Sequence, residues 1–260
     1  MQARIPFGRC PLCECPDLAD SAKGDVSGHP LYHPSLDRLV QWKRCTDCGH
    51  VFTEGYFPDE ALKLIFSRTH EHQQAGVDLE QQRYVSARIV EKVLPYASSG
   101  TWLDVGFGNA SLLFTAQEYG FTPLGLDLRA ENVKAIIALG IEAYCKDIAD
   151  LSTDSACTVI SMADVLEHAP YPKKTLQAAR RLLSDTGVLF ISLPNMESML
   201  WKAMDRQRAN PYWAEIEHFH NFGRSRLYAL LREMGFEPAR YGISERYRAG
   251  MEVIARKARA

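Results

Sequence analysis

From residue 101 to the C-terminus, short runs rich in β-branched residues alternate with longer segments whose apolar residues recur at helical spacing. Such alternation is typical of repeated strand-helix-strand units, in which each helix connects two parallel strands. Gly120 and Gly140 directly follow two of the predicted helices, at the position where a glycine commonly ends a helix. The sequence therefore predicts the α/β class, with helices packed on a mostly parallel sheet.

Seven strands and four helices are predicted in this part of the chain. The strands cover residues 101–105, 123–127, 142–145, 157–162, 187–193, 237–244 and 251–256. The helices cover 110–119, 130–139, 172–183 and 224–234. Two further helical patterns, at 61–66 and 84–94, precede the predicted sheet.

The first predicted strand runs into a glycine-rich turn, Asp104-Val105-Gly106-Phe107-Gly108, and a predicted helix follows at once. The glycines allow a tight turn and a close approach to a ligand, while the helix N-terminus offers free N–H groups. The dinucleotide pattern G-x-G-x-x-G fails, because Ser111 stands three positions after Gly108. The turn alone suits several nucleotide-like ligands, and Asp104 can anchor the turn or the charged end of a zwitterionic ligand.

Two more aspartates follow the next predicted strands. Asp127 ends the second strand, where a carboxylate in this architecture accepts the hydroxyls of a ribose. Asp147 follows the third strand, and a carboxylate there can accept a hydrogen bond from an adenine amino group. Each aspartate alone also fits ordinary turn chemistry. Together they predict a ligand at the carboxyl edge of the sheet, where open α/β sheets bind ligands.

Five segments resemble the successive motifs of class I S-adenosylmethionine-dependent methyltransferases: Leu103–Leu113, Gly125–Asp127, Lys146–Leu151, Asp164–His168 and Gly187–Asn195. The resemblance covers roughly residues 101–257. It implies a Rossmann-like, seven-stranded sheet with helices on both faces and a reversed final strand, here 251–256. It also implies a transferase that uses S-adenosylmethionine as its methyl donor.

The same resemblance implies which residues contact the cofactor. Asp104, Gly106 and Gly108 would line its methionine part, Asp127 its ribose and Asp147 its adenine, and Asp164 in the fourth motif is expected to be cofactor-binding as well. Ala110 stands where many family members have a third glycine. Its small side chain should still allow a close approach of the ligand.

Two Cys-x-x-Cys pairs, Cys10 with Cys13 and Cys45 with Cys48, predict a zinc site near the N-terminus. Four thiolates can surround Zn²⁺ tetrahedrally and leave no open coordination position, so the predicted role is structural. Cys15 or His50 could replace one of the ligands. Of the other cysteines, Cys145 and Cys157 fall in the predicted sheet, and we interpret both as buried thiols.

The predicted organisation has three parts: a zinc-ribbon-like module at 1–57, a helical linker or lid at 58–98 and a methyltransferase domain at 99–260. The whole arrangement resembles that of methyltransferases with an N-terminal zinc-binding module. Some of them act on sugars or polysaccharide precursors, and others, the zinc-bearing guanine methyltransferases, act on ribosomal RNA.

Charge and hydropathy narrow the choice of substrate and compartment. A net charge of −2 and the absence of a Lys/Arg cluster in residues 1–57 argue against a nucleic-acid partner. No apolar run reaches the roughly 18 residues that a membrane span needs, and the N-terminus lacks a signal-peptide core. Seven cysteines, an odd number, fit a reducing compartment and a metal site better than disulfides. A cytoplasmic protein with a small-molecule acceptor is therefore expected.

Three histidines are the candidates for catalysis, since methylation of a hydroxyl needs a base near the acceptor. His168 follows the fourth predicted strand, and His218 and His220 lie in the aromatic segment 211–222, which we predict to form the substrate-side wall. Each histidine could instead satisfy buried backbone groups.

The preferred hypothesis is an enzyme that methylates a hydroxyl, or less favourably a nitrogen or carbon, of a small molecule, sugar or polysaccharide precursor. The alternatives are a zinc-assisted RNA methyltransferase and a non-catalytic scaffold that retains the cofactor fold.

Overall fold

The computed structural model describes residues 4–66, 73–152 and 156–258. The chain divides into two compact units. The first unit combines Met1–Thr69, Glu167–Pro172 and Pro194–Leu227, and the second combines His70–Leu166, Lys173–Leu193 and Tyr228–Ala260. The expected division at residues 57 and 98 stays a prediction about domains, whereas these compact units are assembled from segments far apart in the sequence.

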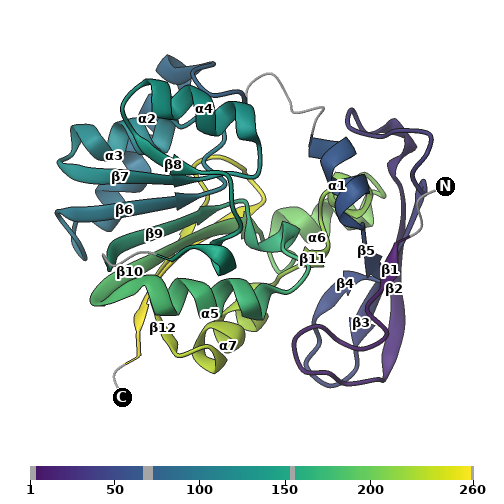
Figure 1. The fold of residues 1–260 in the computed structure, drawn as a ribbon. Coiled ribbons are helices and arrows are strands. Elements are labelled where there is room, and N and C mark those ends of the chain that lie inside the picture. The colour runs from purple at the N-terminus through teal and green to yellow at the C-terminus, as the bar shows by residue number, and fades with distance from the viewer. Residues whose placement is uncertain (1–3, 67–72, 153–155, 259–260) are drawn as a thin grey trace. The chain divides into compact units, whose positions relative to one another are not determined.

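The second unit is built on a seven-stranded sheet of order β12-β13-β10-β9-β6-β7-β8 (Figure 1). Its strands are β6 (Gly100–Val105), β7 (Phe121–Leu126), β8 (Glu142–Tyr144), β9 (Cys157–Ala163), β10 (Leu183–Pro194), β12 (Phe236–Ile243) and β13 (Gly250–Lys257). The five strands from β10 to β8 pair in parallel, while β13 runs antiparallel to β12. The predicted mostly parallel, seven-stranded α/β sheet is confirmed.

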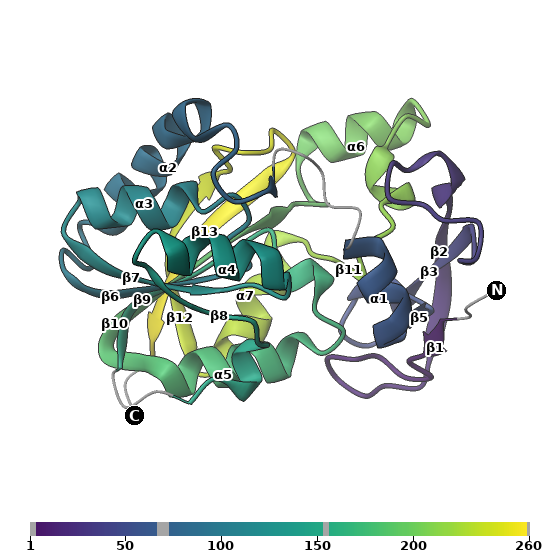
Figure 2. The same ribbon diagram turned by 45° about the horizontal axis from the view of Figure 1, so that its top comes forward.

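Helices cover both faces of this sheet, as Figures 1 and 2 show. One face carries α2 (Leu79–Val93), α3 (Ser111–Glu118) and α4 (Ala130–Ala138), and the other carries α5 (Pro172–Leu182) and the end of α7 (Arg224–Glu233). Val90 of α2 and Trp102 of β6 belong to one apolar core with Phe190 of β10, and all three are fully buried. Among the described residues, no helix is both long and apolar enough to cross a membrane.

The first unit contains a four-stranded sheet of order β11-β4-β3-β2. Its strands are β2 (Leu18–Asp25), β3 (Leu39–Cys45), β4 (Val51–Thr53) and β11 (His220–Asn221), and a separate pair joins β1 (Ile5–Pro6) to β5 (Gly55–Tyr56). The helical elements are η1 (Val26–Gly28), α1 (Asp59–Phe66), α6 (Met199–Arg206) and η5 (Pro211–Ala214). The N-terminal module is thus completed by residues from late in the chain.

An apolar core fills this unit beside the cysteine cluster. Trp42 and Phe57 are fully buried together with Ile216 and Phe219 from the later segment. The Trp42 indole N–H donates to the carbonyl of Trp213 at 2.9 Å. The segment 211–222, expected to form a wall, therefore also completes the hydrophobic core of the N-terminal module.

Gly24 of β2 is expected not to tolerate alanine. A Cβ there would lie 1.8 Å from the carbonyl oxygen of Trp213, so η5 would have to move away from β2 and release the Trp42 hydrogen bond. We expect Gly24→Ala to lower the free energy of unfolding of this unit by about 3 kcal/mol or more, measured by denaturant titration with tryptophan fluorescence. Gly28→Ala is the control, because no atom lies within 4 Å of its Cβ position. Equal stability of the two variants would contradict the close approach.

Candidate active site and metal centre

The glycine-rich turn between β6 and α3 has an unusual backbone. Gly106, Gly108 and Ala110 have φ angles of 67°, 57° and 67°, in the left-handed region that glycine adopts without strain. The Gly106 amide donates to the carbonyl of Leu126 at 2.7 Å, which fastens the turn to the end of β7. Ala110 is fully buried, so its methyl group packs into the core. The turn therefore has a fixed backbone that a ligand can approach closely, and the side chain of Ala110 is accommodated in the core.

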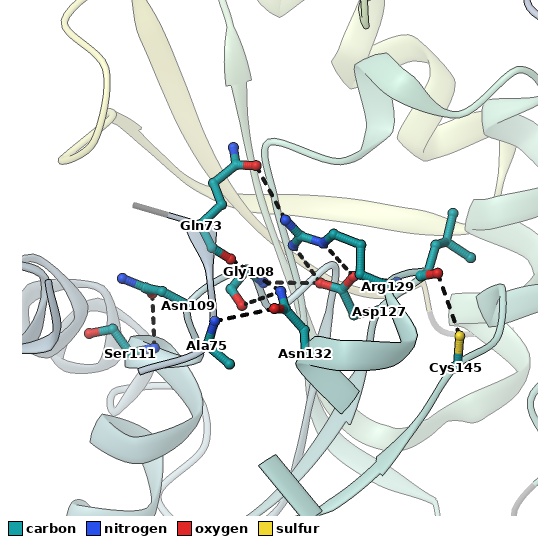
Figure 3. Close-up of polar contacts among 10 residues, drawn as sticks. Gln73, Ala75, Gly108, Asn109, Ser111, Asp127, Arg129, Asn132 and Cys145 are labelled. Atoms are coloured by element: carbon teal, nitrogen blue, oxygen red, sulfur yellow. Dashed lines mark hydrogen bonds and ion pairs between the residues drawn. The ribbon is translucent and has the colours of Figure 1, made fainter. Parts of the chain in front are cut away.

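Asp127 follows β7 and lies directly against this turn (Figure 3). The Gly108 amide donates to its Oδ2 at 3.3 Å, and the Arg129 amide donates to its Oδ1 at 2.9 Å. The guanidinium of Arg129 adds a fork, with Nε 2.8 Å from Oδ1 and Nη2 2.7 Å from Oδ2. A ligand diol that used this carboxylate would therefore compete with Arg129.

A strap of backbone, residues 73–77, is hydrogen-bonded to the turn by two asparagines, of which Figure 3 shows the contacts of Asn132. The side-chain amide of Asn132 donates to the carbonyls of Gln73 and Gly108, both at 3.1 Å, and its oxygen accepts from the Ala75 amide. Asn109 donates to the carbonyl of Val77 at 2.9 Å. Residues 67–72 of the expected lid lie outside the described residues.

Sequence analysis missed Arg129 and Asn132. The signal for Asn132 was available, because it is a polar residue on the apolar face of its helix, beside Val133 and Ile136. Such a buried polar side chain must find hydrogen-bond partners, and here it finds them in the cofactor turn. Arg129 carries no comparable signal, since an arginine before a helix is usually solvated.

Asp104 is buried at the end of β6. Its Oδ1 accepts a 2.6 Å hydrogen bond from the hydroxyl of Ser161, which in turn accepts from the indole N–H of Trp102 at 2.8 Å. Burial raises the pKa of Asp104 to about 6, although the Ser161 hydrogen bond and the charge of Arg246 lower it. The carboxylate is thus present at neutral pH but is held at a cost in stability.

We expect Asp104→Asn to change how stability depends on pH. Because the pKa of Asp104 is higher in the folded than in the unfolded chain, the contribution of Asp104 to wild-type stability should fall as the pH rises through about 4 to 6. Asparagine does not titrate and can still accept from Ser161. Its stability relative to wild type should therefore rise by about 3 kcal/mol between pH 4 and pH 8. Denaturant titrations at the two pH values measure this, and parallel profiles would contradict the assignment.

Asp147 and Asp164 follow β8 and β9. Asp147 is exposed, and its side chain accepts from the Ala149 amide at 2.8 Å, which caps η3 (Ile148–Asp150). Asp164 has a φ of 60°, accepts from the Ser192 hydroxyl at 3.1 Å and lies 3.9 Å from Arg246. With Asp104 and Asp127, every aspartate predicted to contact the cofactor lies at the carboxyl end of a parallel strand.

The four predicted zinc ligands converge in the first unit. Their sulfur atoms all lie within 4.8 Å of one another, with Sγ–Sγ distances of 3.6 Å for Cys10 and Cys48 and 3.4 Å for Cys13 and Cys45. A tetrahedral zinc with bonds of about 2.3 Å places its sulfurs about 3.8 Å apart. The spacing of the four thiols is therefore close to that of a structural zinc site.

The remaining cysteines and His50 differ in their surroundings, and the replacement of a zinc ligand by Cys15 or His50 stays a prediction. Cys15 lies outside the cluster, with its sulfur near the carbonyl of Asp17, and His50 contacts His220 instead. Cys157 is buried, as expected. Cys145 is exposed, which corrects its interpretation as a buried thiol, because β8 ends at Tyr144 and leaves it in the following turn.

All three predicted catalytic histidines lie in the first unit. His220 Nε2 lies 2.9 Å from the carbonyl of Ala169, and its Nδ1 lies 3.0 Å from His50, so both ring nitrogens are engaged. His168 and His218 pack edge to face with ring centroids 4.8 Å apart. Burial lowers the pKa of His218 to about 3 and that of His220 to about 4. Since a base works best with a pKa near the working pH, these values weigh against proton transfer by either residue.

The sheet order, the glycine turn and the aspartates at the strand ends together define a methyltransferase-type α/β domain. Residues 79–240 match a family model described as a methyltransferase domain, which is more than half of the chain. The chain belongs to this family, within the class I S-adenosylmethionine-dependent methyltransferases.

Two curated relatives share the name ubiquinone biosynthesis O-methyltransferase. The one from Paracidovorax citrulli is 34% identical over 103 residues, which is 36% of this chain and 43% of the relative. The one from Bordetella avium is 28% identical over 151 residues, which is 53% of this chain and 62% of the relative. The chain thus spans about half the length of the curated relatives it matches.

Solved structures share the fold at low sequence identity. The 1,6-didemethyltoxoflavin-N1-methyltransferase of Burkholderia thailandensis superposes with a TM-score of 0.57 at 17% identity, over 82% of this chain and 98% of that one. The magnesium protoporphyrin IX methyltransferase of Synechocystis has a TM-score of 0.54 at 18% identity, over 68% and 84%. Both structures contain S-adenosylhomocysteine.

Proposed function

We propose that the protein transfers a methyl group from S-adenosylmethionine to a hydroxyl group of a small molecule. The proposal that S-adenosylmethionine is the methyl donor rests on the placement of Asp104, Asp127 and Asp147. These residues lie at the ends of three adjacent parallel strands, around the glycine-rich turn. Two of these carboxylates, Asp104 and Asp127, are buried and already hold hydrogen bonds. Charged acceptors at a preformed turn suit an adenosine ligand with an amino-acid end.

Each carboxylate is given one task. Asp127 would hold the ribose hydroxyls after Arg129 moves aside, Asp147 would accept from the adenine, and Asp104 with Gly106 and Gly108 would position the methionine end. Asp164 is proposed to assist through its contacts with Ser192 and Arg246. When bound, the cofactor supplies an electrophilic methyl group, so the protein has mainly to position the acceptor and take up its proton.

Two observations support a hydroxyl group, and not a nitrogen or carbon atom, as the methyl acceptor. The curated relatives named above are O-methyltransferases. Hydroxyl methylation also needs a base, and His168 is the predicted histidine best suited to it. Its Nδ1 lies 3.0 Å from the carbonyl of Glu217, so Nδ1 carries the proton in the neutral ring and Nε2 keeps a lone pair. A role for His218 and His220 in proton transfer stays a prediction that their pKa values do not favour.

The cysteine cluster is proposed to hold one structural zinc ion. Its closed set of four thiolates offers no open position to a substrate, so zinc would support the first unit and not the chemistry. The proposed acceptors include a sugar or polysaccharide precursor, and the protein is proposed to act in the cytoplasm.

Two experiments test the proposal. In calorimetry with the full chain, S-adenosylmethionine and S-adenosylhomocysteine should bind, and NAD should not. Transfer of a labelled methyl group is then measured to phenolic, sugar and RNA acceptors, with the product bond identified by mass spectrometry. Methylation of RNA together with retention on heparin would favour the zinc-assisted RNA enzyme. Binding without transfer to any acceptor class would favour the scaffold.

A further inference from the structure

A second cluster of metal-ligating side chains lies in the first unit, separate from the four cysteines. Glu167, His168 and His218 each offer a ligand atom, and these atoms lie within 4.8 Å of one another. Glu167 is 1% and His218 7% exposed. Glu167 and His168 are joined to the later segment by backbone, because the Phe219 amide donates to the carbonyl of Glu167 at 2.9 Å. The backbone that carries the cluster is therefore fixed by the fold of the first unit, and two of its three side chains are buried.

Each of the two rings has a nitrogen that can serve as a metal ligand. The carbonyl of Glu217 can only accept, so its 3.0 Å contact holds the proton on Nδ1 of His168 and leaves Nε2 unprotonated. A histidine that ligates a metal is commonly oriented by such a contact from its other nitrogen. The Nδ1 of His218 is buried and has no hydrogen-bond partner among the described residues. A buried ring nitrogen without a partner is costly unless a ligand satisfies it.

The neighbouring group of His29, Glu215 and Glu217 has different chemistry. The Leu31 amide donates to Nδ1 of His29, which leaves the proton on Nε2, facing Oε1 of Glu215 at 2.5 Å. Burial would lower the pKa of His29, but the hydrogen bond and charge of Glu215 raise it. The contact between His29 and Glu215 occupies both side chains, and the carboxylate of Glu215 also places negative charge near His168 and His218.

We propose that Glu167, His168 and His218 bind one divalent first-row transition-metal ion with open coordination positions. Two imidazoles and one carboxylate are a ligand set that suits Mn²⁺, Fe²⁺, Co²⁺ and Zn²⁺. An ion at the common centre would lie about 2–3 Å from each ligand atom. Three protein ligands leave room for water or for an acceptor hydroxyl, whose pKa the ion would lower. The ion would then perform the task that the proposed function gives to His168 alone, and this last point rests on that function.

The test uses the full chain with its cysteine site loaded with zinc, and Mn²⁺ as the probe, because manganese prefers nitrogen and oxygen to thiolate ligands. Electron paramagnetic resonance counts free Mn²⁺ during a titration. Wild type should bind one equivalent. His218→Ala and the conservative Glu167→Gln should each weaken that binding by at least about tenfold. His33→Ala is the matched control, since this histidine of the same unit contacts Ser35 and should change nothing.

Retention of one zinc per chain and an unchanged circular dichroism spectrum show that each variant is folded. The proposal is overturned if folded wild type binds no Mn²⁺, Co²⁺ or second Zn²⁺, or if His33→Ala weakens binding as much as His218→Ala. Metal binding is measured without methyl transfer, so its failure is separate from a failure of the proposed function. A chain that binds Mn²⁺ but transfers no methyl group would keep the site and remove only the proposed activity.

Discussion

Cys45→Ser is expected to release the zinc ion and to unfold the sheet of the first unit. Cys45 is the last residue of β3, Cys48 lies three positions before the first residue of β4, and Cys10 and Cys13 precede β2. The metal would therefore tie together the ends of three neighbouring strands. A structural zinc site contributes about 10–16 kcal/mol to folding, which equals or exceeds the whole stability of most domains.

Metal content by mass spectrometry and limited proteolysis measure this expectation. Wild type should carry one tightly held zinc and resist cleavage in residues 1–57, whereas Cys45→Ser should lose the metal and be cut there. Cys15→Ser is the control, since its sulfur lies near the carbonyl of Asp17 and outside the cluster. A Cys45→Ser chain that kept its zinc and its resistance would show that the cluster is not a structural zinc site.

The consequence should reach the histidines of the same unit. β11 is paired with β4, with His220 opposite Phe52, and His50, two positions after Cys48, contacts His220. Loss of the zinc should therefore loosen the segment that carries His218. The glycine-rich turn, where the cofactor is proposed to bind, belongs to the second unit. We therefore expect Cys45→Ser to bind S-adenosylmethionine within about threefold of wild type but to lose methyl transfer. Loss of cofactor binding as well would indicate global unfolding.

The fold of the second unit could be predicted because its signals are local. Each strand and helix carries its own periodicity, and α3, α4 and α5 begin and end within a residue or two of their predicted bounds. The cysteine cluster was equally accessible, since the spacing within each pair is itself the signal. These features need no knowledge of what lies nearby in space.

The construction of the first unit could not be predicted in the same way. β11 is two residues long and has no periodicity, and its partner β4 lies about 170 residues earlier in the chain. Whether a histidine there is a base, a metal ligand or a structural group depends on that pairing. The proposed competition between Arg129 and a ribose could likewise not be predicted from the sequence, because it depends on where one flexible side chain lies.

The largest expected effect on ligand binding is that of Asp127→Asn. The carboxylate of Asp127 is 4% exposed and receives hydrogen bonds from Gly108 and Arg129. In the proposed complex it would accept both ribose hydroxyls, and a hydrogen bond to a charged group is worth about 1.5–3 kcal/mol. Asparagine has the same shape but only one accepting oxygen and no charge. Affinity for S-adenosylmethionine should therefore fall by about 100-fold or more in calorimetry.

Two further variants decide whether this loss concerns the ribose. Asp150→Asn removes an exposed carboxylate from η3 and should leave the affinity unchanged. Arg129→Ala removes the group that occupies both oxygens of Asp127, so a competing ribose should bind at least as tightly as in wild type. If Arg129→Ala instead weakened binding as much as Asp127→Asn, the two residues would act as one structural unit and the carboxylate would not contact the cofactor. An affinity of Arg129→Ala at or above that of wild type, with a loss in Asp127→Asn, is the result that a ribose site requires.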